Sequence, residues 1–175
     1  MFTFVRIVFF SLSFGFTFSA FSADDQAIEP LFALEDSLAA SDFELFDQQG
    51  QTHTLADYKG QVLIVNFWAT WCPPCIHEMP ALQNLRTTLR ERGLEVLGIN
   101  MGETQAQVDT FTNQVAVDFP LLLDENMVAT MAWQVQNLPT TFVVNKDGMI
   151  IYAEVGDKPW DDPVIMQQIE ALLID

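Results

Sequence analysis

Two cysteines follow an apolar stretch near the middle of the chain. Residues 62–68 are mostly β-branched, aliphatic and aromatic, which is typical of a buried strand. Cys72 and Cys75 come shortly after this stretch and are separated by Pro73 and Pro74. A helical pattern begins there, with apolar residues near one face at Met79, Leu82, Leu85 and Leu89. The sequence therefore predicts a strand, a tight turn and a helix, with both thiols at the turn.

The predicted position of the thiols favours redox chemistry over a structural role. The thiolate is the reactive form of cysteine, and the partial positive charge of a helix N-terminus stabilises it. A disulfide between Cys72 and Cys75 closes a very small loop, so it constrains little of the unfolded chain. Cys72 lies nearest the helix start and the solvent. We therefore predict that Cys72 is the nucleophile and that Cys75 resolves the mixed disulfide.

Metal binding and haem attachment fit the cysteine pair less well. A zinc site takes about four ligands, and His53 and His77 are the two histidines of the chain. Covalent haem attachment uses a histidine directly after the second cysteine, where this chain has Ile76. We therefore predict no cofactor and no metal site. A metal-binding chaperone that uses the cysteine pair stays open as an alternative.

The segments around the cysteines predict one α/β domain. The helix after them is expected to run over residues 73–92, to kink at Pro80 and to end at Gly93. Parallel connections come early and an antiparallel hairpin comes late, which predicts a mixed sheet flanked by helices. The other expected elements are a hairpin over 43–55, a strand over 94–100, a helix over 104–115, an edge strand or extended segment over 120–123, a short helix over 126–134, a hairpin over 141–155 and a last helix capped by Asp161 and Asp162.

The first 22 residues have the features of a secretory signal. Arg6 is followed by an uncharged apolar stretch over residues 7–21, and Ala20 and Ser22 are small residues suited to cleavage after Ser22. An uncleaved membrane anchor is the alternative, since the stretch is only slightly short of a membrane span. Residues 23–40 form an acidic leader, either flexible or a short surface helix. We therefore expect an exported or periplasmic protein, membrane-bound only if this segment stays uncleaved.

The charge of the chain excludes some partners. It carries 24 acidic and 7 basic residues, a formal net charge of −17. Arg6 is the one basic residue of the predicted signal, so the mature chain has 6 basic residues and a net charge of −18. Such a chain repels nucleic acids and anionic membrane surfaces.

Three separated motifs resemble those of the exported TlpA/ResA-like thiol–disulfide oxidoreductases of the thioredoxin superfamily. They are residues 66–69 (Asn-Phe-Trp-Ala), 71–75 (Trp-Cys-Pro-Pro-Cys) and 138–141 (Leu-Pro-Thr-Thr). The resemblance implies a thioredoxin-like fold over residues 41–175. Residues 104–123 are similar to the insertion that this family carries within the fold.

The resemblance also implies a substrate-binding surface. A cis peptide bond at Pro139 would bring the backbone of Leu138 beside Cys72, where it would pair with an extended segment of a client. We place Trp71, Pro73 and Pro74 on the same surface. A packing role in the core is the alternative for Trp71.

Glu78 is the predicted proton carrier. Thioredoxin has a buried aspartate in the strand before its cysteines, and Asn66 stands at that place here. Glu78 lies three residues after Cys75, so on a helix it shares the cysteine face, and similar proteins carry a glutamate there. We predict that Glu78 transfers a proton to or from Cys75. A solvated surface glutamate is the alternative.

Together these features predict an exported reductant of specific protein disulfides. The resemblance points to apocytochrome c or copper-site cysteines as clients, and to a membrane thiol–disulfide transporter as electron donor. A disulfide oxidant of the same fold is the alternative.

Overall fold

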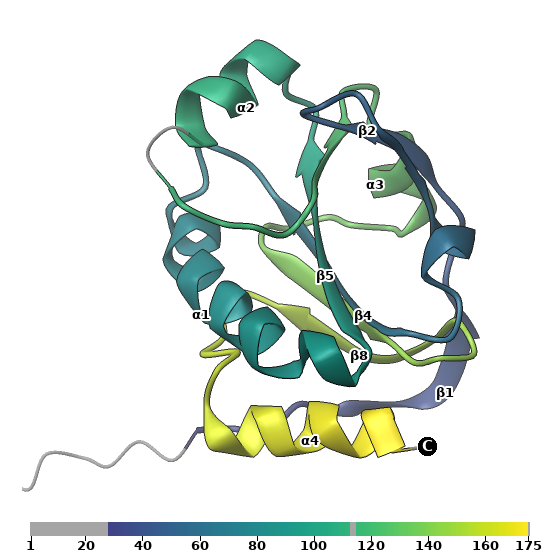
Figure 1. Ribbon diagram of the computed structural model, residues 1–175. Helices are drawn as coiled ribbons and strands as arrows, with labels where there is room; N and C mark the ends of the chain where they lie inside the picture. Colours follow the sequence, from purple (N-terminus) through teal and green to yellow (C-terminus); the bar gives the residue numbers. More distant parts are fainter. Residues whose placement is uncertain (1–27, 113–114, 175) are drawn as a thin grey trace, which may run out of the picture.

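The computed structural model describes residues 28–112 and 115–174, and within them one mixed sheet forms the centre of the molecule (Figure 1). Its strands lie in the order β1-β8-β7-β4-β5-β6-β2-β3. The strands are β1 (Ala33–Ala39), β2 (Glu44–Asp47), β3 (Thr52–Thr54), β4 (Val62–Trp68), β5 (Leu94–Met101), β6 (Leu121–Asp124), β7 (Thr140–Val144) and β8 (Met149–Val155). The helices are α1 (Pro73–Leu89), α2 (Gln105–Thr112), α3 (Val128–Ala132) and α4 (Pro163–Ile174).

Strand β4 lies in the middle of the sheet and carries the chain to the cysteines. Every residue of β4 is buried, because β5 flanks it on one side, β7 on the other, and helices cover both faces. The pairing is parallel to β5 and antiparallel to β7, so Val65 lies between Leu97 and Phe142. This mixed pairing confirms the predicted sheet class.

The helices divide the core into two layers. Helices α1 and α4 contribute apolar residues to the layer on one face of the sheet, and α3 packs against the other face (Figure 1). The layer beneath α1 and α4 includes both cysteines. The cysteine pair therefore belongs to the main core rather than to a separate surface loop.

Two expected elements are wrong. Residues 33–39, expected within a leader or a surface helix, form strand β1, which pairs antiparallel with β8 at one edge of the sheet. Residues 121–124 are not an edge strand, because β6 lies between β5 and β2. Strand β2 of the N-terminal hairpin pairs with β6, so β3 is the edge strand on this side of the sheet. Local sequence does not predict this long-range pairing. The predicted signal and residues 23–27 of the predicted leader lie outside the described residues.

The start and end of α1 and the cap of α4 are as predicted, whereas α3 is shorter than the helix expected over residues 126–134. Helix α1 starts at Pro73 and continues through Pro80 to Leu89, and a short 3₁₀ turn then leads to Gly93. Gly93 has a φ of 100°, a conformation that glycine adopts without strain. At the start of α4, the Asp162 carboxylate accepts a hydrogen bond from the Val164 amide at 2.8 Å. None of the helices in the described residues has the length and hydrophobicity needed to span a bilayer.

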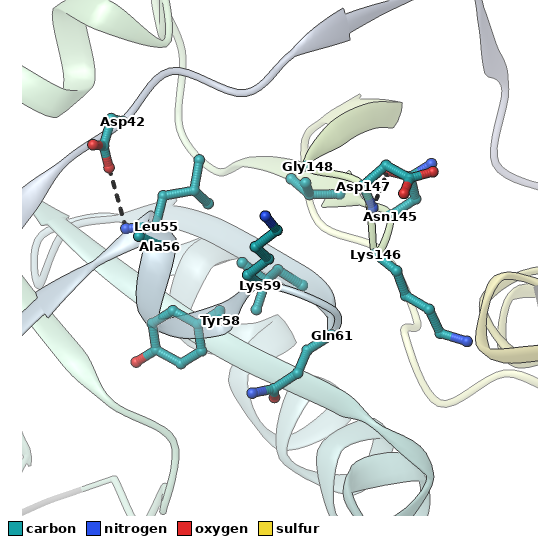
Figure 2. A pocket seen from close by; sticks show the side chains of 12 residues that line it. Asp42, Leu55, Ala56, Tyr58, Lys59, Gln61, Asn145, Lys146, Asp147 and Gly148 are labelled. Carbon is teal, nitrogen blue, oxygen red and sulfur yellow. Dashed lines mark hydrogen bonds between the residues drawn. The ribbon is translucent and has the colours of Figure 1, made fainter.

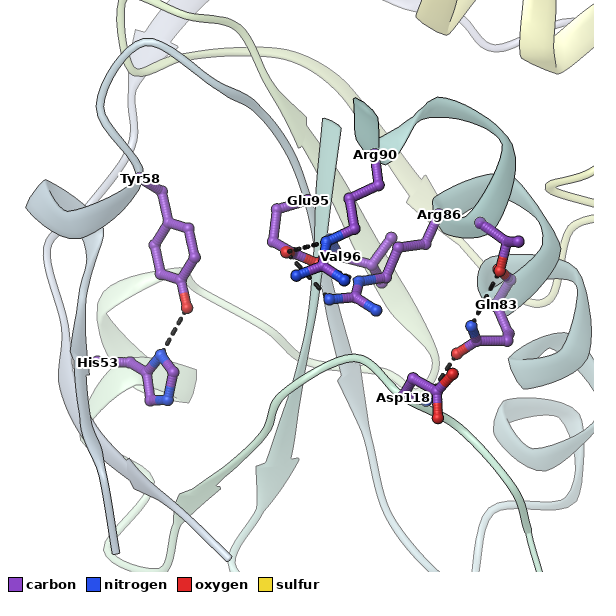
Figure 3. Close-up of polar contacts among 9 residues, drawn as sticks. His53, Tyr58, Gln83, Arg86, Arg90, Glu95, Val96 and Asp118 are labelled. Carbon is purple, nitrogen blue, oxygen red and sulfur yellow. Dashed lines mark hydrogen bonds and ion pairs between the residues drawn. The ribbon is translucent and has the colours of Figure 1, made fainter. Parts of the chain in front are cut away.

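A buried ion pair attaches α1 to β5. The Arg86 guanidinium donates two hydrogen bonds to the Glu95 carboxylate, and Arg90 Nε lies 3.9 Å from the same carboxylate (Figure 3). Both Arg86 and Glu95 are buried. Loss of one charge would therefore leave the other desolvated and poorly compensated.

Arg86→Met is expected to destabilise the fold by about 3 kcal/mol, the low end of the range for broken buried pairs, because Arg90 partly compensates Glu95. Replacing both partners, as in Arg86→Met with Glu95→Leu, should recover most of the loss, because no buried charge then remains. Urea unfolding of the three proteins measures both values. A double variant no more stable than Arg86→Met would contradict the expectation.

A second set of buried polar contacts stabilises the N-terminal hairpin. His53 Nδ1 lies 2.5 Å from the Tyr58 hydroxyl (Figure 3), and His53 Nε2 lies 3.1 Å from Asp47 Oδ2. Burial raises the pKa of Tyr58 well above its ordinary value. Burial also acts to raise the pKa of Asp47, but the hydrogen bonds from His53 and two backbone amides outweigh it and lower that pKa. His53 is therefore a structural residue of the hairpin.

Candidate active site

The cysteine pair lies where β4 passes into α1, as the sequence predicts. Cys72 is the N-cap residue of α1, and it forms a disulfide with Cys75 in the first turn of that helix. In this oxidised state Cys72 is 4% exposed and Cys75 is 0% exposed. Cys72 is thus the more accessible of two largely covered residues, and its role as nucleophile stays a prediction.

The loop before β7 reaches the same end of the sheet as the cysteines. Strand β7 runs antiparallel to β4, and Thr140 at its start pairs with Phe67 near the end of β4. The Leu138–Pro139 peptide bond just before Thr140 is cis, as the resemblance implies. The Pro139 carbonyl accepts a hydrogen bond from the Gly156 amide at 2.9 Å, which ties this loop to the end of β8.

Three of the residues predicted to contact substrate lie at the surface beside the disulfide, whereas Pro139 is buried. Trp71 is 64% exposed, which contradicts the alternative of a core aromatic. Pro73 and Pro74 are also exposed, and they occupy the first two positions of α1. Leu138 is partly buried and packs against both core layers. The contacts that these residues make with a client stay a prediction.

Glu78 is a buried residue, not a solvated one. It is 1% exposed and lies one helical turn after Cys75 on α1. Asn66 Nδ2 donates a hydrogen bond to Glu78 Oε1 at 2.7 Å. The Trp160 indole and the Lys158 backbone amide donate to Oε2 at 2.9 and 3.2 Å. The carboxyl group is thus held between the centre of the sheet and the loop after β8.

The surroundings of Glu78 suit proton transfer near neutral pH. Burial raises the pKa of Glu78 to about 7, against the opposing effect of the hydrogen bonds from Trp160, Asn66 and Lys158. A group whose pKa lies near the ambient pH exchanges protons most effectively. A carboxyl group with a raised pKa, one helical turn from a buried cysteine, is a candidate for acid–base chemistry.

Sequence reasoning missed the partners that hold Glu78. Trp160 is fully buried, and Thr141 accepts a second hydrogen bond from Asn66 at 2.8 Å. Both lie more than sixty positions from Asn66 or Glu78 in the sequence, and no local pattern links them. The one available signal was the apolar character of Trp160 in an otherwise polar loop.

A second buried carboxylate supports the turn before the cysteines. The backbone amide of Thr70 donates to Glu103 Oε2 at 2.7 Å, and the Thr70 hydroxyl donates to Oε1. Asn100 Nδ2 donates to Oε2 at 2.8 Å. Glu103 follows β5, so the strand next to β4 fixes the approach to Cys72. No local sequence pattern singles out Glu103 for this role.

Two pockets differ in their relation to this site. A pocket of about 320 Å³ opens between α1 and the loop after β8, and Glu78, His77 and Asp157 are among its lining residues. It brings solvent close to the buried carboxyl group. Another pocket, of about 310 Å³, includes Leu63 and Lys59 in its lining (Figure 2). It lies at the start of β4, at the opposite end of that strand from the cysteines.

The two histidines are engaged away from the cysteine sulfurs. His53 belongs to the hairpin group with Asp47 and Tyr58, and the exposed His77 lies 2.9 Å from Asp157 through Nδ1. Over residues 28–112 and 115–174, no cluster of three or more histidine, cysteine, aspartate or glutamate side chains is arranged to hold a metal ion.

Comparisons with known proteins agree with this geometry. The AhpC/TSA family matches residues 37–153. Thiol-disulfide oxidoreductase ResA of Geobacillus thermodenitrificans is 36% identical over 133 residues, which are 76% of this chain and 75% of that protein. ResA of Bacillus subtilis is 35% identical over 130 residues, 72% of this chain and 73% of that protein.

Solved structures show the same fold. A thiol:disulfide interchange protein DsbE from Chlorobium tepidum superposes with a TM-score of 0.74 at 28% identity, covering 80% of this chain and 99% of that one. A thioredoxin family thiol:disulfide interchange protein from the same organism gives a TM-score of 0.68 at 25% identity, with 79% and 97% covered. The chain therefore belongs to the AhpC/TSA family with a thioredoxin-like fold, and within it to the ResA-like thiol–disulfide oxidoreductases.

Proposed function

We propose that this oxidoreductase works as a reductant of client protein disulfides through the Cys72–Cys75 couple. The observation that supports this direction is the position of Pro73 and Pro74 at the first two positions of α1. Prolines have no N–H group, so fewer amides are available to stabilise a Cys72 thiolate. A strongly oxidising couple needs a stabilised reduced form. The two prolines weaken that stabilisation and so favour a reductant.

The reaction begins when the Cys72 thiolate attacks a client disulfide. A bond forms between the Cys72 sulfur and one client sulfur, the client disulfide breaks, and the second client sulfur leaves as a thiolate that takes a proton from solvent. Trp71 and the backbone at Leu138 hold the client segment beside Cys72 in this step. The exposed side of the turn serves for client contact.

The second step releases the reduced client. The Cys75 thiol gives its proton to Glu78, and the Cys75 sulfur attacks the Cys72 sulfur. The Cys72–Cys75 bond forms while the mixed disulfide breaks, and the client sulfur leaves as a thiolate. The client gains two electrons and the enzyme couple loses two. An external dithiol must then reduce the enzyme.

The compartment, clients and electron donor are part of the same proposal. The secretory features of residues 1–22 support export, with membrane attachment if that segment is retained. The resemblance to ResA-like proteins supports cytochrome c or copper-site cysteines as clients. It also supports a transmembrane thiol–disulfide carrier as electron donor, because an exported reductant needs a supply of electrons.

The reduction potential of the Cys72–Cys75 couple tests the proposed direction. Equilibration with a thiol buffer of known potential, followed by tryptophan fluorescence, is expected to give a value near or below the roughly −270 mV of thioredoxin. A value near the roughly −120 mV of a strong oxidant would instead make the protein a disulfide oxidant. Tight stoichiometric metal binding by the reduced protein, lost in Cys72→Ser, would favour the metal chaperone.

A further inference from the structure

Three neighbours hydrogen-bond the carboxyl group of Glu78, and each of them donates. Asn66 Nδ2 donates to Oε1, while Trp160 Nε1 and the Lys158 backbone amide donate to Oε2. This arrangement suits a carboxylate, which only accepts hydrogen bonds. It does not suit the neutral acid. A proton added to Oε2 would point at the Trp160 or Lys158 donor, and a proton added to Oε1 finds no acceptor among these three neighbours unless Asn66 turns.

Asn66 is the one neighbour among these three that can become an acceptor. An indole N–H and a backbone N–H carry no free lone pair, so Trp160 and the Lys158 amide always donate. A side-chain amide has a donor end and an acceptor end, and a half-turn about its last torsion exchanges them. Asn66 Oδ1 is buried and has no hydrogen-bond partner among the described residues. The half-turn therefore breaks no hydrogen bond of Oδ1.

Thr141 can hydrogen-bond the Asn66 side-chain amide in both of its orientations. Asn66 Nδ2 also donates to the Thr141 hydroxyl at 2.8 Å. A hydroxyl both donates and accepts. With the amide turned, Asn66 Oδ1 accepts one hydrogen bond from the Glu78 acid O–H and a second from the Thr141 O–H. In each protonation state of Glu78, Asn66 can therefore make two hydrogen bonds, one with Glu78 and one with Thr141.

We propose that the Asn66 side chain turns by half a rotation whenever Glu78 gains or loses its proton. When Glu78 takes the Cys75 proton, the S–H bond breaks, the electron pair stays on sulfur and the new O–H donates to Asn66 Oδ1. Asn66 is a positioning residue that keeps the neutral acid hydrogen-bonded. An aspartate at this place would instead put a second negative charge beside Glu78.

The use of this turn in the reaction rests on the proposed proton transfer between Cys75 and Glu78, but the turn itself needs only the titration of Glu78. Asn66 on β4 and Thr141 on β7 are uncharged in every state. The titratable or charged groups that line a pocket together with Glu78 are His77 on α1 and Asp157, Lys158 and Asp161 in the loop after β8. Cys75 lies one helical turn before Glu78 on α1, and Glu154 on β8 pairs with Thr141. Lys158 is paired with Glu154 at 3.1 Å, and His77 with Asp157.

The test is nuclear magnetic resonance of the Asn66 side-chain amide in the oxidised protein, with the carboxyl carbon of Glu78 followed in the same pH titration. Above the Glu78 midpoint, the Asn66 amide protons are expected to show contacts with Glu78 and Thr141. Below the midpoint these contacts should be lost together, with the same midpoint as the Glu78 carbon. Amide protons that keep both contacts through the whole titration would overturn the proposal.

Glu78→Gln supplies a second, independent arm. A glutamine imitates the neutral acid, with an oxygen for Trp160 and Lys158 and an N–H group for Asn66. The Asn66 amide is expected to stay in the turned orientation at every pH in this variant. Persistence of the contact between the Asn66 amide protons and Thr141 in Glu78→Gln would also count against the turn.

Asn100 offers a matched control. It is a buried asparagine whose Nδ2 also donates to a buried glutamate, Glu103, and whose Oδ1 also lacks a partner among the described residues. Its amide should not respond at the Glu78 midpoint. Asn66→Leu is expected to raise that midpoint by about one pH unit, because the carboxylate loses a donor, whereas Asn100→Leu should leave it unchanged.

Failure of this inference and failure of the proposed function are distinguishable. The resonances report on Asn66 whether or not the protein reduces clients. A wild-type protein that fails to exchange with client disulfides contradicts the function alone. A fixed Asn66 amide in an active protein contradicts the inference alone.

Discussion

Cys75→Ala is expected to stop turnover and to leave the protein covalently attached to its clients. Cys72 still attacks the client disulfide in this variant, but no second thiol is present to resolve the product. The resolving attack is intramolecular, so its loss should slow release of the client by at least about a thousandfold. The small change of a buried side chain should leave the fold intact. Non-reducing electrophoresis and intact mass measurement with a disulfide-bonded protein substrate detect the mixed disulfide.

Cys72→Ser is the matched control for this trap. It keeps Cys75, which is fully buried in the oxidised structure, and removes the more accessible sulfur. It should form no mixed disulfide. Accumulation of adducts through Cys75 in Cys72→Ser, with none through Cys72 in Cys75→Ala, would reverse the two roles. The same trap applied in cells would identify clients, and their recovery from the exported fraction would support the proposed compartment.

Glu78→Gln is expected to remove most of the pH dependence of stability between about pH 4.5 and 7 in the oxidised protein. Burial raises the pKa of Glu78 from 4.5 to about 7 in the folded chain. Between these values the folded state binds a proton that the unfolded state has already released. The contribution of Glu78 is therefore fully present below pH 4.5 and is lost as the pH rises through about 7. This loss amounts to about 3 kcal/mol.

Urea unfolding at a series of pH values, with the disulfide intact, measures this loss. Wild-type stability should fall through the window, and the slope should be nearly absent in Glu78→Gln. Glu91→Gln is the control, because Glu91 is an exposed carboxyl in the turn after α1. That variant should keep the wild-type slope. An unchanged slope in Glu78→Gln would show that another group carries the pH dependence.

The fold class was predictable because its main signals are local. The apolar residues of β4 and the spacing on α1 each show in a short window of sequence. The turn at residues 146–148 and the cap at Asp162 depend on residues at neighbouring positions in the chain. The early parallel and late antiparallel connections then left few possible arrangements of the sheet. The strand at residues 33–39 was missed because its pairing partner lies more than a hundred positions away.

The sequence by itself determined the chemistry of this protein, and tertiary structure decided how that chemistry is controlled. The order Cys72-Pro73-Pro74-Cys75 after an apolar strand places two thiols at a helix start, whatever the rest of the chain does. The sequence also placed Glu78 on the cysteine face, but left open whether it is solvated. Its burial and its contact with Trp160 depend on the loop that follows β8. Because the pKa of a carboxyl group depends on desolvation and on partners distant in the sequence, only the folded chain gives Glu78 the raised pKa that the proposed proton transfer needs.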